Sequence, residues 1–356
     1  MNMKIAVDCR MLGMSGIGVF LENILSYLIP QNTNIDFILI GSAEKLGQYK
    51  DLSNCQMLIN EIPIFSVKEL LFFPVKEINK CDVYFSPNFN IPMGISIPIF
   101  STVHDVVFLD IKGLTTKIGL QIRKYSIKRA LKISKKVFTV SNFSKERIQY
   151  HYGNLDKLVV VYNIVKPNIN KFIIKEKSPY LFDYVLFVGN IKRHKGISLL
   201  LEAYRILLSE GFEKKLVIVG SCENFKTEDI EIKELMYNNK NDLVFTGRLS
   251  DDELYDIMSH ATLLIQPSLY EGFGIPPLEA LYFGIPVLIS NIPVFKEIFS
   301  KLPVNYFNID NIDDLVVKIK LYSETNNLNI SNLRILINDL FNQSVSVNTI
   351  LNTFNS

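Results

Sequence analysis

Two glutamates, Glu271 and Glu279, stand eight positions apart across a glycine-rich turn. The apolar run 262–267 before them indicates a buried strand, and Pro276 and Pro277 suit the first turn of a helix, where a missing N–H is not needed. Amides at a helix start attract phosphate, and carboxylates are strong acceptors for sugar hydroxyls. The pattern predicts a nucleotide-sugar site. The alternative is a plain strand–turn–helix connection whose glutamates cap a helix and face water.

A second charged cluster, Lys192, Arg193, His194 and Lys195, follows the strand predicted at 184–189. A cation at a strand–helix turn can neutralise a diphosphate leaving group without any metal. A solvated basic loop is a reasonable alternative for the first two residues. It is a weaker one for Lys195, which abuts the start of the next predicted helix.

His104 stands at the end of an apolar strand predicted at 98–103, where open α/β sheets place functional side chains. A neutral imidazole there could hydrogen-bond a sugar hydroxyl or share a proton with Asp105. A strand-end histidine satisfied by the backbone is the alternative.

Glycines 13, 16 and 18 follow the first predicted strand, but their spacing differs from the dinucleotide fingerprint G-x-G-x-x-G. No acidic residue ends the second strand, so a nicotinamide-dependent enzyme is disfavoured. The turn at Gly16 and Gly18 could still approach a phosphate or a sugar closely, and a plain turn is equally compatible.

A helix start is predicted at Ser250, an N-cap residue with Glu253 at the capping-box position. The backbone just before it, up to Leu249, could flank a nucleobase. The sequence has no Asp-x-Asp after a strand, no H-E-x-x-H, no G-x-S-x-G and no phosphate-binding P-loop, so no metal site and no protein nucleophile are predicted.

The chain has 356 residues, of which 48% are hydrophobic, and this length favours two domains. Basic residues are in excess in the first half, concentrated between Lys112 and Arg147, where Glu146 is the single acidic residue. Such asymmetry indicates an anionic partner for the first half. Nucleic acid is not expected as a partner. Within 112–147, a helix at 116–133 carries apolar residues at helical spacing, at positions 118, 122, 127, 130 and 131. Peripheral membrane contact is one interpretation, but a core-packed helix with a basic outer face is favoured.

The four cysteines, Cys9, Cys55, Cys81 and Cys222, have no metal or disulfide spacing. Cys9 and Cys81 look like small core residues, which fits a reducing cytoplasm. Met1 leads directly into a strand, so no secretory signal is expected, and no apolar run reaches membrane-spanning length. The expected location is the cytoplasm, and a position at the inner face of the cell membrane is the alternative.

Strand and helix patterns alternate along the chain, which predicts an α/β fold with parallel, doubly wound sheets. The first half has strands at 4–9, 35–40, 83–86, 98–103, 136–140 and 158–162 and helices at 19–29, 66–79, 116–133 and 143–151. The second half has strands at 184–189, 215–220, 242–246, 262–266 and 286–290 and helices near 196–210, 251–259, 276–283, 293–299, 311–323 and 329–341. We predict Rossmann-like domains at 1–168 and 169–340, facing a central cleft, and a segment 341–356 that packs back on the first domain.

Together these sites resemble the retaining glycosyltransferases of family 4, which have the GT-B fold. Glu271 and Glu279 match the E-x7-E motif of that family, and residues 140–144 and 247–254 also resemble it. The opening, 7–18, is similar to mannosyl- and rhamnosyltransferases of bacterial surface polysaccharides. The resemblance runs from Lys4 to about Leu315.

The resemblance implies a role for each matching position. His104 would lie beside the transferred sugar, Lys195 would bind the diphosphate, Glu271 would hold sugar hydroxyls and Glu279 the ribose. The donor cradle would be completed by Gly16, Gly18, Arg193, Leu249, Gly272, Phe273, Gly274 and Ile275. Some members carry an arginine where this chain has Asn190. The second cation would then come from Arg193 or His194, or be absent.

The expected reaction is transfer of a hexose, of the mannose or rhamnose type, from a GDP-, UDP- or dTDP-linked donor, with retention and without a cofactor. The expected acceptor is a glycan or a lipid-linked oligosaccharide. Two alternatives remain open: another two-domain nucleotide-sugar enzyme, such as an epimerase, and a non-catalytic scaffold subunit of a polysaccharide assembly.

Overall fold

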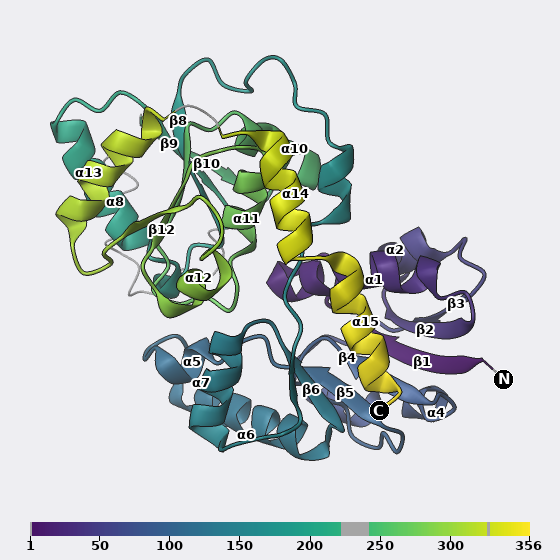
Figure 1. Ribbon diagram of the computed structural model, residues 1–356. Coiled ribbons are helices and arrows are strands. Elements are labelled where there is room, and N and C mark those ends of the chain that lie inside the picture. Colours follow the sequence, from purple (N-terminus) through teal and green to yellow (C-terminus); the bar gives the residue numbers. More distant parts are fainter. Residues whose placement is uncertain (1, 222–241, 326–327) are drawn as a thin grey trace. The chain divides into compact units, whose positions relative to one another are not determined.

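The computed structural model describes residues 2–221, 242–325 and 328–356. The chain divides into two compact units, each built on its own parallel sheet (Figure 1). Unit 1 comprises the chain up to Pro167 together with Phe341–Ser356, and unit 2 comprises Asn168–Leu340.

Unit 1 has a seven-stranded sheet in the order β3-β2-β1-β4-β5-β6-β7, with every described pairing parallel. Its strands are β1 (Met3–Asp8), β2 (Ile35–Gly41), β3 (Cys55–Ile59), β4 (Val83–Ser86), β5 (Ile99–Thr102), β6 (Lys136–Thr139) and β7 (Leu158–Val160). Its helices are α1 (Ser15–Gln31), α2 (Ala43–Leu46), α3 (Val67–Phe72), α4 (Val75–Ile78), α5 (Val107–Asp110), α6 (Lys117–Ile133), α7 (Asn142–Tyr152) and α15 (Gln343–Phe354).

The C-terminal helix α15 is part of unit 1 although more than 170 residues of unit 2 precede it. It packs against α1, and Gln343 donates to the carbonyl of Asn23 at 2.8 Å. Phe354 inserts its ring among Phe100, Phe85 and Phe138, at centroid distances of 4.9, 5.6 and 6.2 Å. This aromatic cluster ties the end of the chain to the middle strands of the first sheet.

Unit 2 has a six-stranded parallel sheet in the order β10-β9-β8-β11-β12-β13. Its strands are β8 (Tyr184–Val188), β9 (Lys215–Val219), β10 (Leu243–Gly247), β11 (Leu263–Gln266), β12 (Val287–Ser290) and β13 (Asn305–Phe307). Its helices are α8 (Ile197–Ser209), α10 (Asp251–Ser259), α11 (Ile275–Tyr282), α12 (Pro293–Ile298), α13 (Ile312–Ser323) and α14 (Ile330–Leu340), with short turns η2 (Pro167–Lys171) and η3 (Arg193–Lys195).

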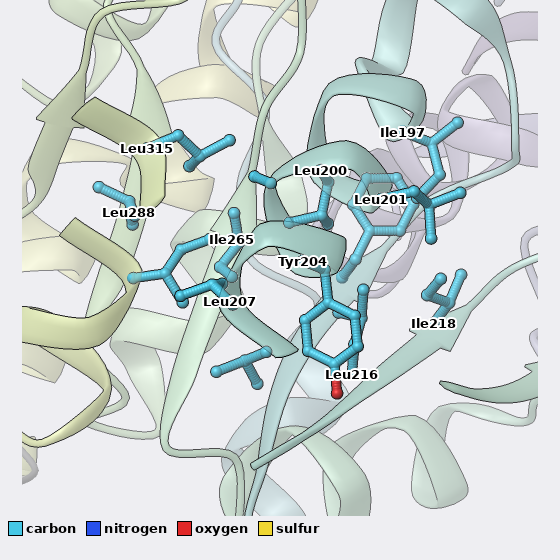
Figure 2. Packing of buried hydrophobic residues seen from close by; sticks show 14 of the residues in the cluster. Ile197, Leu200, Leu201, Tyr204, Leu207, Leu216, Ile218, Ile265, Leu288 and Leu315 are labelled. Atoms are coloured by element: carbon cyan, nitrogen blue, oxygen red, sulfur yellow. The ribbon is translucent and has the colours of Figure 1, made fainter. Parts of the chain in front are cut away.

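Helix α8 shows why these residues form a helix that lies on the sheet. Its apolar residues recur every three or four positions, so they share one face, and Figure 2 shows that face packed on the strands and on α13. Tyr204 is buried in this core, and its hydroxyl donates to the carbonyls of Lys214 and Asp242 at 3.0 and 3.1 Å. The cluster labelled in Figure 2 comprises Ile197, Leu200, Leu201, Tyr204, Leu207, Leu216, Ile218, Ile265, Leu288 and Leu315.

The predicted fold class, two doubly wound Rossmann-like domains, is confirmed. The sequence pattern misses two strands, β3 and β13, which lie at sheet edges and are short or half-exposed, so that neither is a continuous buried run. The single helix predicted at 66–79 is wrong, because Pro74 divides it into α3 and α4.

Helix α6 corrects the favoured prediction for the basic segment 112–147. Ile127, Ala130 and Leu131 are buried as expected of a core-packed helix. Ile118 and Ile122, however, are 75% and 60% exposed. The apolar spacing of the sequence therefore spans two faces with different surroundings, and only the C-terminal half of α6 packs on the core.

In the described part of the chain, no helix combines the length and the apolar character needed to cross a bilayer. Cys9 and Cys81 are buried with free thiols, as predicted, and Cys55 is half-buried and free. Cys222 lies outside the described residues.

Candidate active site

Two charged residues that the sequence analysis singled out, Lys195 and Glu271, form an ion pair in unit 2. The Nζ atom of Lys195 lies 2.7 Å from Oε1 and 2.8 Å from Oε2 of Glu271. Lys195 ends η3, after β8, and Glu271 lies in the turn after β11, and these two strands are neighbours in the sheet. Strand order reverses between them, so the ion pair sits at the carboxyl end of the topological switch point, where open α/β sheets bind ligands.

Gly196 allows these two turns to touch. It has a left-handed φ of 69°, and a Cβ atom there would lie 1.8 Å from the carbonyl oxygen of Pro267. The amide of Leu269 also donates to the carbonyl of His194 at 2.8 Å. A side chain at position 196 would push the two turns apart and with them Lys195 and Glu271.

The carboxylate of Glu271 has two further donors that the sequence analysis did not identify. Ser268 Oγ lies 2.8 Å from Oε1 and Gln266 Nε2 lies 3.3 Å from it, and both side chains are almost fully buried. Gln266 also donates to Ser268 Oγ at 3.0 Å, which links the two donors. Among the residues whose contacts the structure describes, Oε1 thus accepts hydrogen bonds from Lys195, Ser268 and Gln266, whereas Oε2 accepts only from Lys195. In the sequence, the available signal was that polar residues stand three and five positions before Glu271.

The glycine-rich turn leads from Glu271 into α11, as predicted. Gly274 has a φ of 111°, and a Cβ atom there would lie 2.8 Å from Cε1 of Phe295, so a glycine is required. Phe273 is buried, and Ile275 begins α11, with Pro276 and Pro277 in the first turn. Glu279 lies one turn further along and is only 4% exposed. The burial of Glu279 contradicts the alternative in which this glutamate faces water.

The second cation of the site has two candidates, His194 and Arg193. Burial, together with the neighbouring Lys195 cation, lowers the pKa of His194 to about 4, so His194 is neutral at pH 7. Arg193 is exposed and charged. Asn190, the departure from the family pattern, accepts from Ser221 Oγ at 3.3 Å. Of the two candidates only Arg193 carries a charge at neutral pH.

Leu249 follows β10 and is half-buried. The predicted capping box is confirmed: Ser250 accepts from the Glu253 amide, and the Glu253 carboxylate accepts from the Ser250 amide at 2.9 Å. Leu249 is therefore held next to a well-defined helix start.

His104 lies in unit 1, two residues after β5. Its Nε2 is 2.9 Å from the carbonyl oxygen of Pro87, and its ring meets Phe20 edge-on at 5.0 Å. A carbonyl can only accept, so Nε2 carries the hydrogen and Nδ1 presents a lone pair. Burial lowers the pKa of His104 to about 4, which keeps the imidazole neutral at pH 7. The hydrogen bond to the backbone that is expected of a structural histidine is therefore present. The lone pair of Nδ1 could still accept a hydrogen bond from a hydroxyl.

Gly16 and Gly18 lie within the first turn of α1 and not in the preceding loop. A Cβ atom at Gly18 would lie 2.2 Å from the carbonyl oxygen of Met11, so packing requires this glycine. A Cβ atom at Gly16 would meet nothing within 4 Å, which leaves the backbone there accessible.

A buried charged network at the end of β1 also escaped the sequence analysis. Arg10 pairs with Asp8 at 2.6 Å and with Glu69 at 2.5 Å, and its guanidinium stacks on Phe73 at 4.3 Å. Burial raises the pKa of Glu69, partly offset by Arg10. Arg10, Asp8 and Glu69 pair their charges with one another. We therefore assign them a structural role, which is to hold together the segments that follow β1 and β3.

The residues brought together in unit 2 are thus Lys195, Glu271 and the start of α11, while His104, Gly16 and Gly18 belong to unit 1. No cluster of three or more histidine, cysteine or acidic side chains with metal-binding geometry occurs in the described ranges.

Part of the chain matches a known family and resembles curated proteins. Residues 168–330 match the family described as "Glycosyl transferases group 1". The chain is 32% identical over 178 residues to the O-antigen chain mannosyltransferase RfbU of Salmonella typhimurium, covering 50% of this chain and 48% of that protein. It is 26% identical over 227 residues to the O-antigen chain mannosyltransferase B of Escherichia coli, covering 61% and 58%. The chain thus spans about half the length of these curated relatives.

Solved structures extend the likeness to the whole fold. HepE of Anabaena in complex with UDP-glucose matches with a TM-score of 0.74 at 16% identity, over 99% of this chain and all of that chain. Sucrose-phosphate synthase of Thermosynechococcus elongatus matches with a TM-score of 0.73 at 16% identity, over 99% and 98%. These neighbours have the GT-B fold, which confirms the predicted architecture of paired Rossmann-like domains.

Proposed function

We propose that this chain, whose residues 168–330 match the group 1 glycosyltransferases, transfers a hexose from a nucleoside diphosphate to a glycan acceptor. The observation that carries the proposal is the pairing of Lys195 with Glu271 beside the start of α11. One group suits a diphosphate, the other suits sugar hydroxyls, and the helix start suits phosphate. The site has the three features that a nucleotide sugar needs.

Donor binding requires that Lys195 exchange partners. The diphosphate carries more negative charge than a carboxylate, so it can draw the ammonium away from Glu271. Ser268 and Gln266 then keep the Glu271 carboxylate in place, and Oε2 becomes available to a sugar hydroxyl. Glu279 would accept from the ribose hydroxyls, and Arg193 would supply the second cation.

In the transfer step, the bond between the anomeric carbon and the diphosphate oxygen breaks, and a bond to the acceptor oxygen forms. Charge on the sugar resembles an oxocarbenium ion in the transition state, and charge on the leaving diphosphate is stabilised by Lys195 and the α11 amides. The acceptor proton passes to the leaving phosphate, so no protein nucleophile is needed. Because the acceptor hydroxyl gives its proton to the leaving phosphate, it would attack from the face that the diphosphate leaves, and we propose that the anomeric configuration is retained.

His104 would accept a hydrogen bond through Nδ1 from a hydroxyl of the transferred sugar or of the acceptor. Its hydrogen is committed to the Pro87 carbonyl, so it cannot donate from Nε2 as well. A neutral acceptor at pH 7 fits a positioning contact to a hydroxyl better than a contact to phosphate.

The two O-antigen mannosyltransferases among the relatives support a mannose-type donor and a polysaccharide acceptor. The UDP and UDP-glucose complexes of HepE support nucleotide-sugar binding by this fold. We therefore propose a GDP-, UDP- or dTDP-linked hexose as donor, with mannose tested first.

The experiment that tests the function is thermal unfolding of the whole chain with GDP, UDP, dTDP, ADP and their sugars, without added metal. Binding to the folded state raises stability in proportion to ln(1 + [L]/Kd). We expect one nucleotide family to raise Tm and expect Glu279→Ala to abolish that rise. Glu202→Ala, on the exposed face of α8, is the matched control and should respond like the natural chain. No shift with any nucleotide would contradict the proposal and favour a scaffold role.

An assay of sugar transfer separates a transferase from an epimerase. A transferase releases nucleotide from its donor only when an acceptor is added, whereas an epimerase changes the donor without one. His104→Ala should reduce transfer and leave nucleotide-induced stabilisation nearly unchanged. Full transfer activity in both His104→Ala and Glu279→Ala would show that the site is wrongly assigned.

A further inference from the structure

The outward face of α6 carries large apolar side chains that the rest of unit 1 does not cover. Ile118, Ile122 and Tyr125 are 75%, 60% and 66% exposed. They are spaced four and three positions apart, so they form one stripe along the first half of the helix. Three adjacent exposed side chains of this size form a patch and not a scatter of single residues.

A row of lysines runs beside this apolar stripe. Lys124, Lys128 and Lys132 are spaced four positions apart, so they lie along one side of α6 and line a groove of about 690 Å³. The groove continues along the end of α7, where His151 and Tyr152 line it, and its apolar lining comprises Leu109, Leu131 and Leu155. It therefore joins a positively charged rim to an apolar floor.

No acidic residue of α6 offsets these charges, because the helix has none. The carboxylate of Asp110, next to the groove on α5, is already bound by Arg147 at 2.9 and 2.5 Å and by His151 at 2.7 Å. The lysines thus face the groove with their charge uncompensated by that carboxylate, which selects an anionic partner.

We propose that the outer face of α6 and its lysine groove bind the surface of an anionic phospholipid bilayer. Lysines would reach lipid phosphates while Ile118, Ile122 and Tyr125 enter the boundary between headgroups and acyl chains. A helix with apolar residues on one side and lysines beside them, lying in the plane of the membrane, has this composition. The inference concerns unit 1 alone and does not depend on the sugar chemistry proposed for unit 2.

The test is sedimentation of the whole chain with vesicles of phosphatidylcholine, with and without phosphatidylglycerol. We expect binding only to the anionic vesicles, with affinity that falls as salt is raised. Each lysine near an anionic surface contributes about 1 kcal/mol, so each replacement by alanine should weaken partitioning roughly fivefold. Ile118→Ser with Ile122→Ser should weaken it as well, without removing a charge.

The matched control replaces three exposed lysines of unit 2, Lys171, Lys177 and Lys301, by alanine, which removes the same charge elsewhere. Equal loss in this control and in the variant that replaces Lys124, Lys128 and Lys132 together by alanine would show that only net charge matters and would overturn the proposal. Competition by soluble glycerol phosphate at low concentration would show a free-phosphate site and would also overturn it. Unchanged binding in the Ile118→Ser, Ile122→Ser variant would contradict apolar insertion. Because all the replaced side chains are exposed, thermal unfolding should confirm that every variant stays folded.

Discussion

At the scale of single residues, Glu271 is the most constrained group of the candidate site. Its carboxylate accepts from a cation and from two neutral donors that are buried with it. Neutral donors do not leave when a diphosphate arrives, whereas Lys195 can. Ser268 and Gln266 are therefore positioning residues in this proposal, since they would keep the orientation of Glu271 while its cation changes partner.

Ser268→Ala should weaken binding of the nucleotide sugar roughly tenfold and leave binding of the free nucleotide unchanged. Loss of one hydrogen bond to a charged group costs about 1.5 kcal/mol, and Glu271 would contact only the sugar. Calorimetric titration with both ligands measures the ratio, and Ser268→Thr should restore it in part. Ser300→Ala, an exposed serine that bonds only the Glu297 carbonyl among the described contacts, is the control. An unchanged ratio in Ser268→Ala would reject the positioning role.

The two buried histidines predict how stability depends on pH. The pKa of His104 and of His194 is lowered to about 4 in the folded chain, below the usual value of 6.5. Between pH 6.5 and 4 the unfolded chain binds more protons, so the free energy of unfolding falls as the pH falls through this window. The effect is at most about 3 kcal/mol per histidine and vanishes above pH 6.5. Urea unfolding at several pH values measures it, and His194→Gln should flatten the slope; an equal slope would contradict the assignment.

At the scale of elements, the site depends on two strand–helix turns of unit 2 that approach through a glycine. Lys195 and Glu271 are 76 residues apart in the sequence, and the close contact of Gly196 with the Pro267 carbonyl brings their turns together. The same sheet order places both turns beside the start of α11. Local helix and strand preferences alone do not produce this contact.

Gly196→Ala should abolish donor binding and destabilise unit 2 strongly, whereas Gly211→Ala should cost only about 1 kcal/mol. Both glycines have left-handed φ values, 69° and 80°, so both substitutions carry the same backbone strain. Only at position 196 does the new Cβ atom meet another backbone, whereas position 211 has nothing within 4 Å. Thermal unfolding and nucleotide binding measured on both variants separate strain from collision. Similar losses in both would show that the Pro267 contact is unimportant.

At the scale of the whole molecule, the chain returns to unit 1 after completing unit 2. Phe354, almost at the C-terminus, fills a cluster of three phenylalanines from β4, β5 and β6. Helix α15 therefore completes the core of unit 1 although it follows the whole of unit 2 in the sequence. Unit 1 depends on residues from both ends of the chain.

Phe354→Ala should destabilise unit 1 by about 3–5 kcal/mol, the usual cost of removing a buried phenylalanine. Val345→Ala, on the exposed side of the same helix, should cost little. Hydrogen exchange resolves the effect by unit: amides of β4, β5 and β6 should exchange faster, while those of β8 and β9 keep their protection. Equal acceleration in both units, or none in unit 1, would contradict this division of the fold.

The sequence by itself was sufficient for the doubly wound fold class, most strands and helices, the capping box at Ser250 and the choice of Lys195 and Glu271 as candidate site residues. These features depend on local periodicity and on turn chemistry, which neighbouring residues determine. The edge strands β3 and β13 escaped because half-exposed or three-residue runs carry little periodic signal.

Only the tertiary structure decided which groups touch. Ser268 and Gln266 are ordinary polar residues until the fold buries them against Glu271, and Gly196 is an ordinary helix-start glycine until Pro267 approaches it. Likewise, the apolar spacing of α6 identifies the side chains of Ile118 and Ile122 but not whether anything covers them. Periodicity reports the chemical nature of a surface, whereas its partner comes from segments distant in the chain.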